Sequence, residues 1–233
     1  MRRARVLLAD DHQIVAEGLC SLLETEFDII GTVSDGRALV EAARQLRPEV
    51  IVVDISMPLL NGLDATRQVK RASPETQVIV LTMHADATYA TRAIEAGAAG
   101  YVLKHSASAE LVTAIREALQ DRAFVSPCLA TGSPRVLIDR RQAPDETPLT
   151  PRQREVLQLL AEGYSAKGIA AILGISSRTA EFHKYRMMEM LKVQTGAELI
   201  RYAIRHGIIS TDMVESQTTA SRACDPPGPS PAP

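Results

Sequence analysis

Short apolar runs and amphipathic segments alternate over the first 120 residues of the chain. The apolar runs are rich in valine, isoleucine and leucine, and they predict five strands, at residues 4–11, 27–36, 50–54, 76–82 and 100–104. Segments with apolar residues at helical spacing lie between them, and the last, at residues 106–120, begins with a serine and glutamate capping arrangement. Strands that alternate with helices in this way predict an α/β fold, a doubly wound five-stranded parallel sheet.

A carboxylate ends the most apolar of these strands. Residues 50–53 are Val-Ile-Val-Val, bounded on each side by a proline, and the run stops at Asp54. A strand buried on both faces should end on a charge only where it reaches the open edge of the sheet. The other strands also end in polar residues, which are Asp10 with Asp11, Thr82 and Lys104. Because the carboxyl ends of parallel strands meet at one edge, we expect these side chains to converge there.

The charges of such a cluster indicate its chemistry. Three carboxylates close together repel one another unless a cation lies among them, and oxygen ligands suit Mg²⁺, which commonly shares its site with a phosphate. Lys104 and Thr82 could donate to phosphate oxygens, and Asp54 could act as a nucleophile toward a phosphoryl group. Each residue alone is ordinary at a strand end, so the prediction rests on the set. The first strand is not followed by a glycine-rich phosphate loop, which disfavours nucleotide binding.

Residues 121–147 break the alternation. They mix proline, glycine and serine with balanced charge, and they predict a flexible linker. Helical spacing returns in four segments, at residues 150–163, 165–175, 176–191 and 193–209. Residues 148–209 therefore predict a small all-α four-helix domain, and the short turn between its second and third helices indicates a helix-turn-helix. Residues 210–233 have little apolar content and end in proline and glycine, which predicts a disordered tail.

The two parts of the chain differ in their balance of basic and acidic residues. Residues 1–120 contain 12 Lys/Arg and 16 Asp/Glu residues, whereas residues 148–207 contain 9 and 5. The basic second part favours an anionic polymer as its partner, with chance variation on solvated faces as the alternative. Three widely spaced cysteines favour a reducing cytoplasm over a metal cluster. The apolar runs are too short for a membrane span, and the start of the chain predicts a strand and not a signal peptide.

Residues 4–120 resemble the receiver domain of bacterial two-component response regulators, which has a flavodoxin-like fold. The residues that carry the resemblance are the Asp10-Asp11 pair, Asp54 with Met57-Pro58 after it, Thr82, and Tyr101 with Lys104 three residues later. The resemblance places a receiver domain at residues 1–120. It implies that Asp54 accepts a phosphoryl group from the phosphohistidine of a sensor histidine kinase.

The resemblance also implies a role for the other members of the cluster. Asp11, Asp54 and the backbone carbonyl of Ser56 would ligate Mg²⁺, with Asp10 acting mostly through water. The residues implied to respond to the phosphoryl group are Lys104 and the switch pair, Thr82 and Tyr101, which would change position on phosphorylation.

Residues 148–209 resemble the DNA-binding domain of the LuxR/FixJ/NarL type. The matching sequences are LTPRQREVL, AEG at 161–163, IA at 169–170, and the GIS…T..FH pattern that leads into MLKV. The resemblance implies that the third helix enters the major groove of double-stranded DNA. The net positive charge is modest, so we expect a homodimer after phosphorylation, with the fourth helices packed together and a two-fold DNA site.

Spacing along the third helix assigns its faces. Ala180, His183, Met187 and Leu191 form one stripe, which is expected to pack inward. The residues assigned to base edges are Glu181, Phe182 and Tyr185. The residues assigned to phosphate contacts are Arg178, Thr179, Lys184 and Lys192.

The two resemblances together predict a transcription regulator, not an enzyme, in which phosphorylation of Asp54 controls DNA binding. RNA polymerase is a candidate further partner. One alternative is a phosphorylation-independent DNA-binding regulator whose receiver domain serves only for dimerisation. Another is an aspartyl-phosphate phosphatase, but the haloacid-dehalogenase phosphatases need a second aspartate two residues after the nucleophile, where this chain has Ser56.

Overall fold

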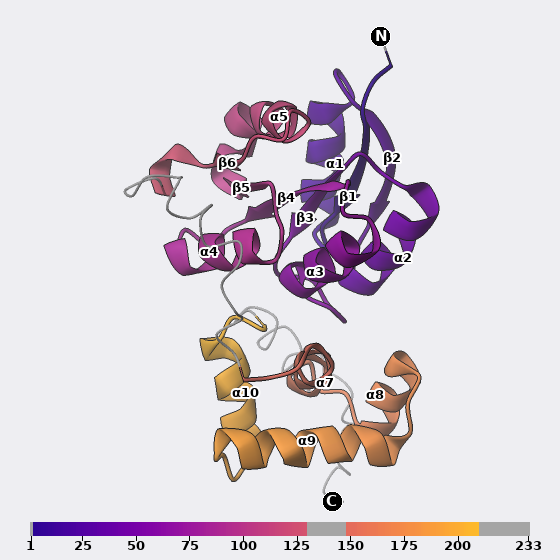
Figure 1. Cartoon of the computed structure of the whole chain (residues 1–233), viewed down its shortest axis with the longest axis vertical. Helices are drawn as coiled ribbons and strands as arrows, with labels where there is room; N and C mark the ends of the chain where they lie inside the picture. Colours follow the sequence, from indigo (N-terminus) through magenta and orange to yellow (C-terminus); the bar gives the residue numbers. More distant parts are fainter. Residues whose placement is uncertain (1, 130–147, 210–233) are drawn as a thin grey trace, which may run out of the picture. The chain divides into compact units, whose positions relative to one another are not determined.

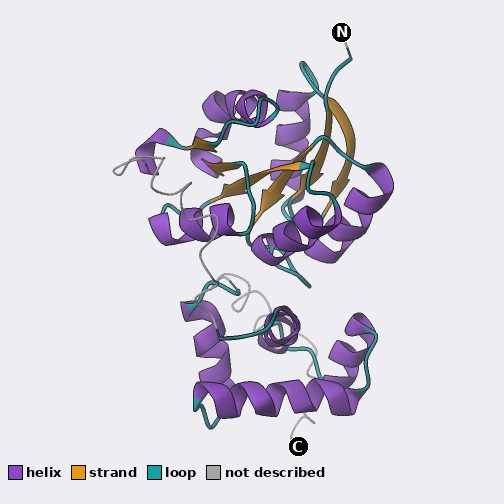
Figure 2. Ribbon diagram, in the orientation of Figure 1, coloured by secondary structure: helices purple, strands orange, loops and turns teal. Residues whose placement is uncertain are grey.

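The chain divides at Pro151 into two compact units. The computed structural model describes residues 2–129 and 148–209, coloured along the chain in Figure 1. In the described residues, the first unit is built on a sheet and the second is entirely helical, as Figure 2 shows. This is the predicted order of an α/β unit and an all-α unit.

Six parallel strands form the sheet in the described part of the first unit. Their order across the sheet is β2-β1-β3-β4-β5-β6. The strands are β1 (Arg5–Ala9), β2 (Asp28–Val33), β3 (Val50–Asp54), β4 (Gln77–Thr82), β5 (Gly100–Leu103) and β6 (Phe124–Val125). The predicted doubly wound parallel sheet is confirmed. The strand order reverses between β1 and β3, so the ends of these two strands frame the crevice where sites form in such sheets.

Among residues 2–129, five helices cover the two faces of this sheet. They are α1 (Gln13–Leu23), α2 (Gly36–Leu46), α3 (Gly62–Ala72), α4 (Ala87–Glu95) and α5 (Ala107–Ala118). Helices α1 and α5 pack on one face, and α2, α3 and α4 pack on the other (Figure 1). Side chains of β3 alternate between the two faces, with Ile51 and Val53 in one core cluster and Val50 and Val52 in the other. Burial on both sides explains why this strand is apolar throughout.

The sixth strand is a departure from the predicted five. β6 pairs with β5 at Gly100 and Tyr101, and the short 3-10 helix η2 (Pro127–Leu129) follows it. The flexible linker predicted to begin at residue 121 therefore starts with ordered structure. A strand of two residues is too short to show an alternating pattern, so the sequence did not predict it. The rest of the predicted linker, residues 130–147, and the predicted tail, residues 210–233, lie outside the described residues.

The second unit contains the four predicted helices. They are α7 (Pro151–Ala161), α8 (Ala166–Leu173), α9 (Ser177–Leu191) and α10 (Gly196–Arg205). Gly174 ends α8 in the left-handed conformation with φ of 63°, and the Ser176 side chain caps α9 by accepting from the Thr179 N–H. This short turn gives the predicted helix-turn-helix. Throughout residues 2–129 and 148–209, the helices are too short or too polar to span a membrane.

Candidate functional site

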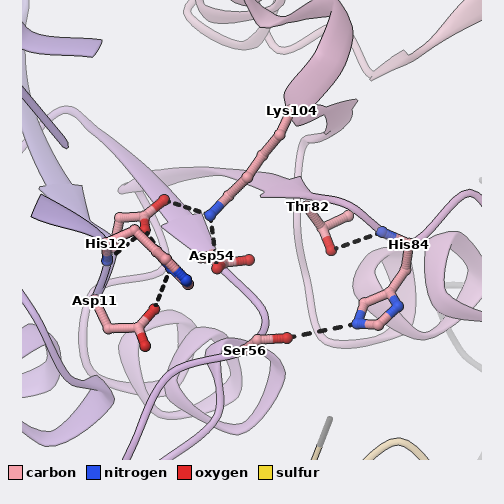
Figure 3. Close-up of polar contacts among 8 residues, drawn as sticks. Asp11, His12, Asp54, Ser56, Thr82, His84 and Lys104 are labelled. Carbon is pink, nitrogen blue, oxygen red and sulfur yellow. Dashed lines mark hydrogen bonds and ion pairs between the residues drawn. The ribbon is translucent and has the colours of Figure 1, made fainter. Parts of the chain in front are cut away.

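The carboxyl ends of β1, β3, β4 and β5 bring the predicted polar residues to one edge of the sheet. The carboxylate oxygens of Asp10, Asp11 and Asp54 lie within 4.8 Å of one another. Thr82 ends β4 and Lys104 directly follows β5, and both lie at the same edge as Asp54 (Figure 3). The parallel register explains this convergence, because Asp54 pairs with the residue before Thr82, and Thr82 pairs with the residue before Lys104.

Lys104 bridges two of the carboxylates. Its Nζ lies 2.6 Å from Asp10 Oδ2 and 2.8 Å from Asp54 Oδ2. The Asp10 and Asp54 side chains are buried, with exposed fractions of 2% and 4%, and that of Lys104 is 10% exposed. Burial alone would lower the pKa of Lys104, but the charges and hydrogen bonds of Asp54 and Asp10 raise it above its ordinary value. The ammonium group therefore stays charged and holds the two carboxylates together.

Asp11 and His12 complete an acidic cluster around Asp54. The His12 Nδ1 lies 3.0 Å from Asp11 Oδ1 and 3.4 Å from Asp10 Oδ1. Burial raises the pKa of Asp11, His12 opposes this effect, and the charge of Asp54 adds to it. Because one ammonium group cannot balance three carboxylates, the donor set suits a further cation that takes oxygen ligands.

The loop after β3 fixes the backbone of Asp54. The Gly62 N–H donates to the Ile55 carbonyl at 2.9 Å, which places the start of α3 directly against the end of β3. A Cβ atom on Gly62 would lie 2.0 Å from the Asp54 carbonyl oxygen, so the site needs glycine there. Ser56 lies in the same loop, and its Oγ faces the His84 ring at 3.5 Å from Nε2 (Figure 3).

Thr82 and Tyr101 both bond to the backbone of His84. The His84 N–H donates to Thr82 Oγ1 at 3.2 Å, and the Tyr101 hydroxyl donates to the His84 carbonyl at 2.7 Å. Tyr101 is fully buried, and burial raises the pKa of its hydroxyl well above the ordinary value. The His84 ring stacks on Tyr89 of α4, with ring centroids 4.4 Å apart. One loop residue thus connects both predicted switch residues with α4.

Neither His12 nor His84 was predicted to belong to the site. His12 directly follows the aspartate pair, and His84 follows Thr82 by two residues, so each stands beside a predicted site residue in the sequence. The direction of their rings depends on the loops after β1 and β4, whose conformations the apolar pattern does not specify. Figure 3 shows the His12 ring beside the carboxylate of Asp11 and the His84 ring facing Ser56.

The second unit presents the residues predicted to meet DNA along α9. Phe182 and Tyr185 have exposed fractions of 59% and 64%, which are large for aromatic side chains, and Glu181 is also exposed. Of the residues assigned to phosphates, Arg178 and Lys192 are exposed, and Thr179 and Lys184 are half-buried.

Thr179 and Arg186 differ from what the sequence predicted. The Thr179 hydroxyl lies 2.8 Å from Ser176 Oγ, so the cap of α9 already engages it. Arg186 is exposed and pairs with Glu189 at 2.9 Å, and it is not among the residues predicted to contact DNA.

The inward stripe of α9 is only partly buried. Ala180 and Met187 are buried, whereas His183 and Leu191 are half-buried. Burial lowers the pKa of His183, and the charge of Arg152 lowers it further, so the neutral imidazole is favoured. The His183 ring also makes an edge contact with Phe182, with ring centroids 6.0 Å apart.

The sequence matches two family models in the same order as the two units. Residues 6–116 match the response regulator receiver domain, and residues 147–203 match the bacterial regulatory proteins of the LuxR family. The transcriptional regulatory protein MctR of Rhizobium johnstonii is 39% identical over 210 residues, which are 89% of this chain and 96% of that protein. The oxygen regulatory protein NreC of Staphylococcus epidermidis is 31% identical over 88% of this chain and 99% of that protein.

Solved structures share the fold over both units. A structure of the RcsB response regulator of Salmonella typhimurium is 30% identical, with a TM-score of 0.59, and covers 87% of this chain and 97% of that one. A structure of an RcsB–DNA complex is 28% identical, with a TM-score of 0.52, and covers 86% of this chain and 98% of that one. The likeness extends to the order of the two domains.

Proposed function

Because the chain belongs to the response regulators that join a receiver domain to a LuxR-type DNA-binding domain, we propose that phosphorylation of Asp54 controls its binding to DNA. The observation that carries this proposal is the contact of Lys104 Nζ with both Asp10 and Asp54 at the open edge of the sheet. A buried carboxylate held by an ammonium group beside other carboxylates is suited to accept and retain a phosphoryl group.

The proposed chemistry is a phosphoryl transfer to Asp54. A carboxylate oxygen of Asp54 attacks the phosphorus of a phosphohistidine on a sensor histidine kinase. The new P–O bond forms as the P–N bond breaks, and the kinase imidazole leaves. Lys104, already 2.8 Å from Asp54 Oδ2, can then donate to a phosphoryl oxygen. Mg²⁺ would be held by Asp11, Asp54 and the Ser56 carbonyl, with Asp10 mostly through water. The ion would supply positive charge that balances the negative charge of the phosphoryl group.

The proposed switch begins at Thr82. Its hydroxyl accepts from the His84 N–H, and a phosphoryl group on Asp54 offers that hydroxyl a stronger, charged acceptor. A move of Thr82 toward the phosphoryl group gives up the bond to His84, whose carbonyl holds the Tyr101 hydroxyl. Phosphorylation would thereby shift the equilibrium between two arrangements of this loop and of α4.

The proposed DNA reader is α9. Its exposed aromatic residues Phe182 and Tyr185 would meet base edges in the major groove, where apolar groups can contact the thymine methyl, and Glu181 can accept from cytosine N4. The proposed phosphate contacts are Arg178, Thr179, Lys184 and Lys192. A related structure contains two RcsB dimers bound to two parallel DNAs, and we propose that this chain also binds DNA as a dimer.

Phosphoryl uptake by the purified chain tests the site. With acetyl phosphate and Mg²⁺, intact mass spectrometry should detect one added phosphoryl group on the wild type and none on Asp54→Asn. The matched control is Asp28→Asn, which changes an exposed aspartate at the start of β2 and should leave the uptake unchanged. Equal uptake by Asp54→Asn and the wild type would show that the phosphoryl group is attached elsewhere.

A further inference from the structure

Residues 124–129, named here the β6 segment, bond directly to the backbone around the switch residue. The Phe124 N–H donates to the Ala99 carbonyl at 3.0 Å, and the Ser126 N–H donates to the Tyr101 carbonyl at 2.9 Å. Within the described residues, the β6 segment comes last before the chain resumes at residue 148 with the second unit. The part of the chain that leads toward the DNA-binding domain is therefore attached to Tyr101.

Ser126 is the centre of this attachment. It is fully buried, with an exposed fraction of 0%. Its Oγ accepts from the Leu103 N–H at 3.1 Å and donates to a carboxylate oxygen of Glu110 on α5. Leu103 directly precedes Lys104, whose ammonium group holds Asp54. One serine thus bonds to the backbone of Tyr101 and to that of the residue next to Lys104.

Apolar contacts hold the two ends of the β6 segment on opposite faces of the sheet. Phe124 packs against the core cluster that includes α5, and Leu129 packs against the cluster that includes Tyr101 and α4. The Leu129 N–H also donates to the Ser126 carbonyl at 2.9 Å. A shift of Tyr101 or of the end of β5 must either move this segment with it or break hydrogen bonds that are buried.

We propose that Ser126 is a positioning residue that transmits the state of the phosphoryl site to the chain segment leading to the DNA-binding domain. This rests on the proposed control of DNA binding by phosphorylation. Because Ser126 contacts neither Asp54 nor the phosphoryl position, its loss leaves phosphoryl uptake largely intact. Without the hydroxyl, Leu103 loses its bond to the β6 segment. Leu103 and Lys104 can then shift on phosphorylation while the segment stays in place, still bonded to the Tyr101 carbonyl through the Ser126 N–H.

The test compares four variants of the full chain. Ser126→Ala removes both bonds of the hydroxyl, and Ser126→Thr retains a hydroxyl at the same position. Leu129→Ala weakens the attachment of the same segment without touching Ser126. The matched control is Thr76→Val, which removes another buried hydroxyl, one that donates to the Pro48 carbonyl at 3.0 Å at the opposite end of the strands.

Two readouts are measured for each variant. The first is the fraction phosphorylated by acetyl phosphate with Mg²⁺. The second is the ratio of DNA affinities with and without phosphorylation, at one fixed salt concentration, on a duplex that the phosphorylated wild type selects from a randomised pool. Of the two bonds that Ser126→Ala removes, only that from the Leu103 N–H joins the β6 segment to β5, so the ratio should fall about five-fold, the factor that one buried hydrogen bond contributes. The phosphorylated fraction of Ser126→Ala should stay close to that of the wild type, and Ser126→Thr should restore the ratio.

The outcomes separate this inference from the function on which it rests. If Ser126→Ala keeps the wild-type ratio, or if Thr76→Val lowers the ratio as much, the inference is overturned and phosphorylation control stands. If Ser126→Ala does not fold, a full wild-type ratio for Leu129→Ala overturns it instead. If the phosphorylated wild type selects no duplex or shows no gain in affinity, the proposed function fails and the inference fails with it.

Discussion

The start of α3 contacts the backbone of Asp54, so Gly62→Ala tests whether this close packing fixes the position of Asp54. A Cβ at Gly62 would lie 2.0 Å from the Asp54 carbonyl oxygen and 3.0 Å from the Ile55 Cα. Contacts under 3.0 Å essentially do not occur for a real Cβ, so the two backbone segments must separate by about 1 Å. The obstructing atom belongs to the main chain at the end of a central strand and cannot rotate away.

The expected cost follows from this clash. Overpacking of a tight core typically costs about 1–3 kcal/mol, and a rigid backbone neighbour places Gly62→Ala near the upper end of that range. The gain in helix propensity from glycine to alanine, about 0.5–1 kcal/mol, offsets only part of it. For a domain of this size, the net loss corresponds to a fall of roughly 10 °C in the melting temperature of the receiver. A shift of Asp54 by about 1 Å should also slow phosphoryl uptake, by as much as about 100-fold.

Calorimetry of the full chain and the rate of uptake from acetyl phosphate measure these two effects. Gly18→Ala is the matched control within the same domain, because Gly18 lies exposed in α1 and its added Cβ would have no neighbour within 4 Å. It should raise the melting temperature slightly and leave the uptake rate unchanged. A Gly62→Ala protein as stable and as rapidly phosphorylated as the wild type would refute the close packing of α3 on Asp54.

Four further substitutions test the charges and the DNA contacts of the two domains. Asp11→Asn should raise the melting temperature of the metal-free protein. Burial and the charge of Asp54 raise the pKa of Asp11, so the ionised carboxylate destabilises the fold at neutral pH. Thermal unfolding in EDTA and in Mg²⁺ should show that Mg²⁺ stabilises the wild type more than the variant. The lowered pKa of His183 means that the unfolded chain binds a proton more readily, so the DNA-binding domain should lose stability as the pH falls below 6.5. Urea unfolding as a function of pH should show a weaker dependence for His183→Gln. Lys192→Ala should reduce by about 1 the magnitude of the slope of log DNA affinity against log salt concentration. Tyr185→Ala should change the preferred DNA sequence and weaken binding to the wild-type site by about 1–3 kcal/mol.

The strand ends could be predicted because parallel sheets impose their geometry on the sequence. Once residues 50–54 are a buried strand and residues 100–103 another, Asp54 and Lys104 must reach the same edge. The contact of Lys104 with both Asp10 and Asp54 follows from that placement. The sequence could not specify how the loops close above them, and so His84, which bonds to both Thr82 and Tyr101, was not predicted.

The β6 segment could not be predicted from the periodicity of apolar residues. Phe124 and Val125 form a strand of only two residues, and serine and then proline follow them directly. Their strand conformation depends on the free edge of β5 and on the bonds of Ser126 to Tyr101 and Leu103, which are tertiary contacts. The inward stripe of α9 has a similar limit, because helical spacing assigns a face to His183 but not the depth of its burial.

The most direct test of the central claim is the DNA affinity of the wild-type chain with and without phosphorylation of Asp54. Both forms are measured at one salt concentration on the same selected duplex, with intact mass confirming the phosphorylated fraction. Coupling between two sites in one protein is typically about 5-fold to 150-fold, and the phosphorylated form should bind more tightly by a factor in that range. Asp54→Asn treated with acetyl phosphate should show no gain. Equal affinity of the fully phosphorylated and unphosphorylated wild type would contradict control by Asp54 and favour a regulator whose receiver serves only for dimerisation.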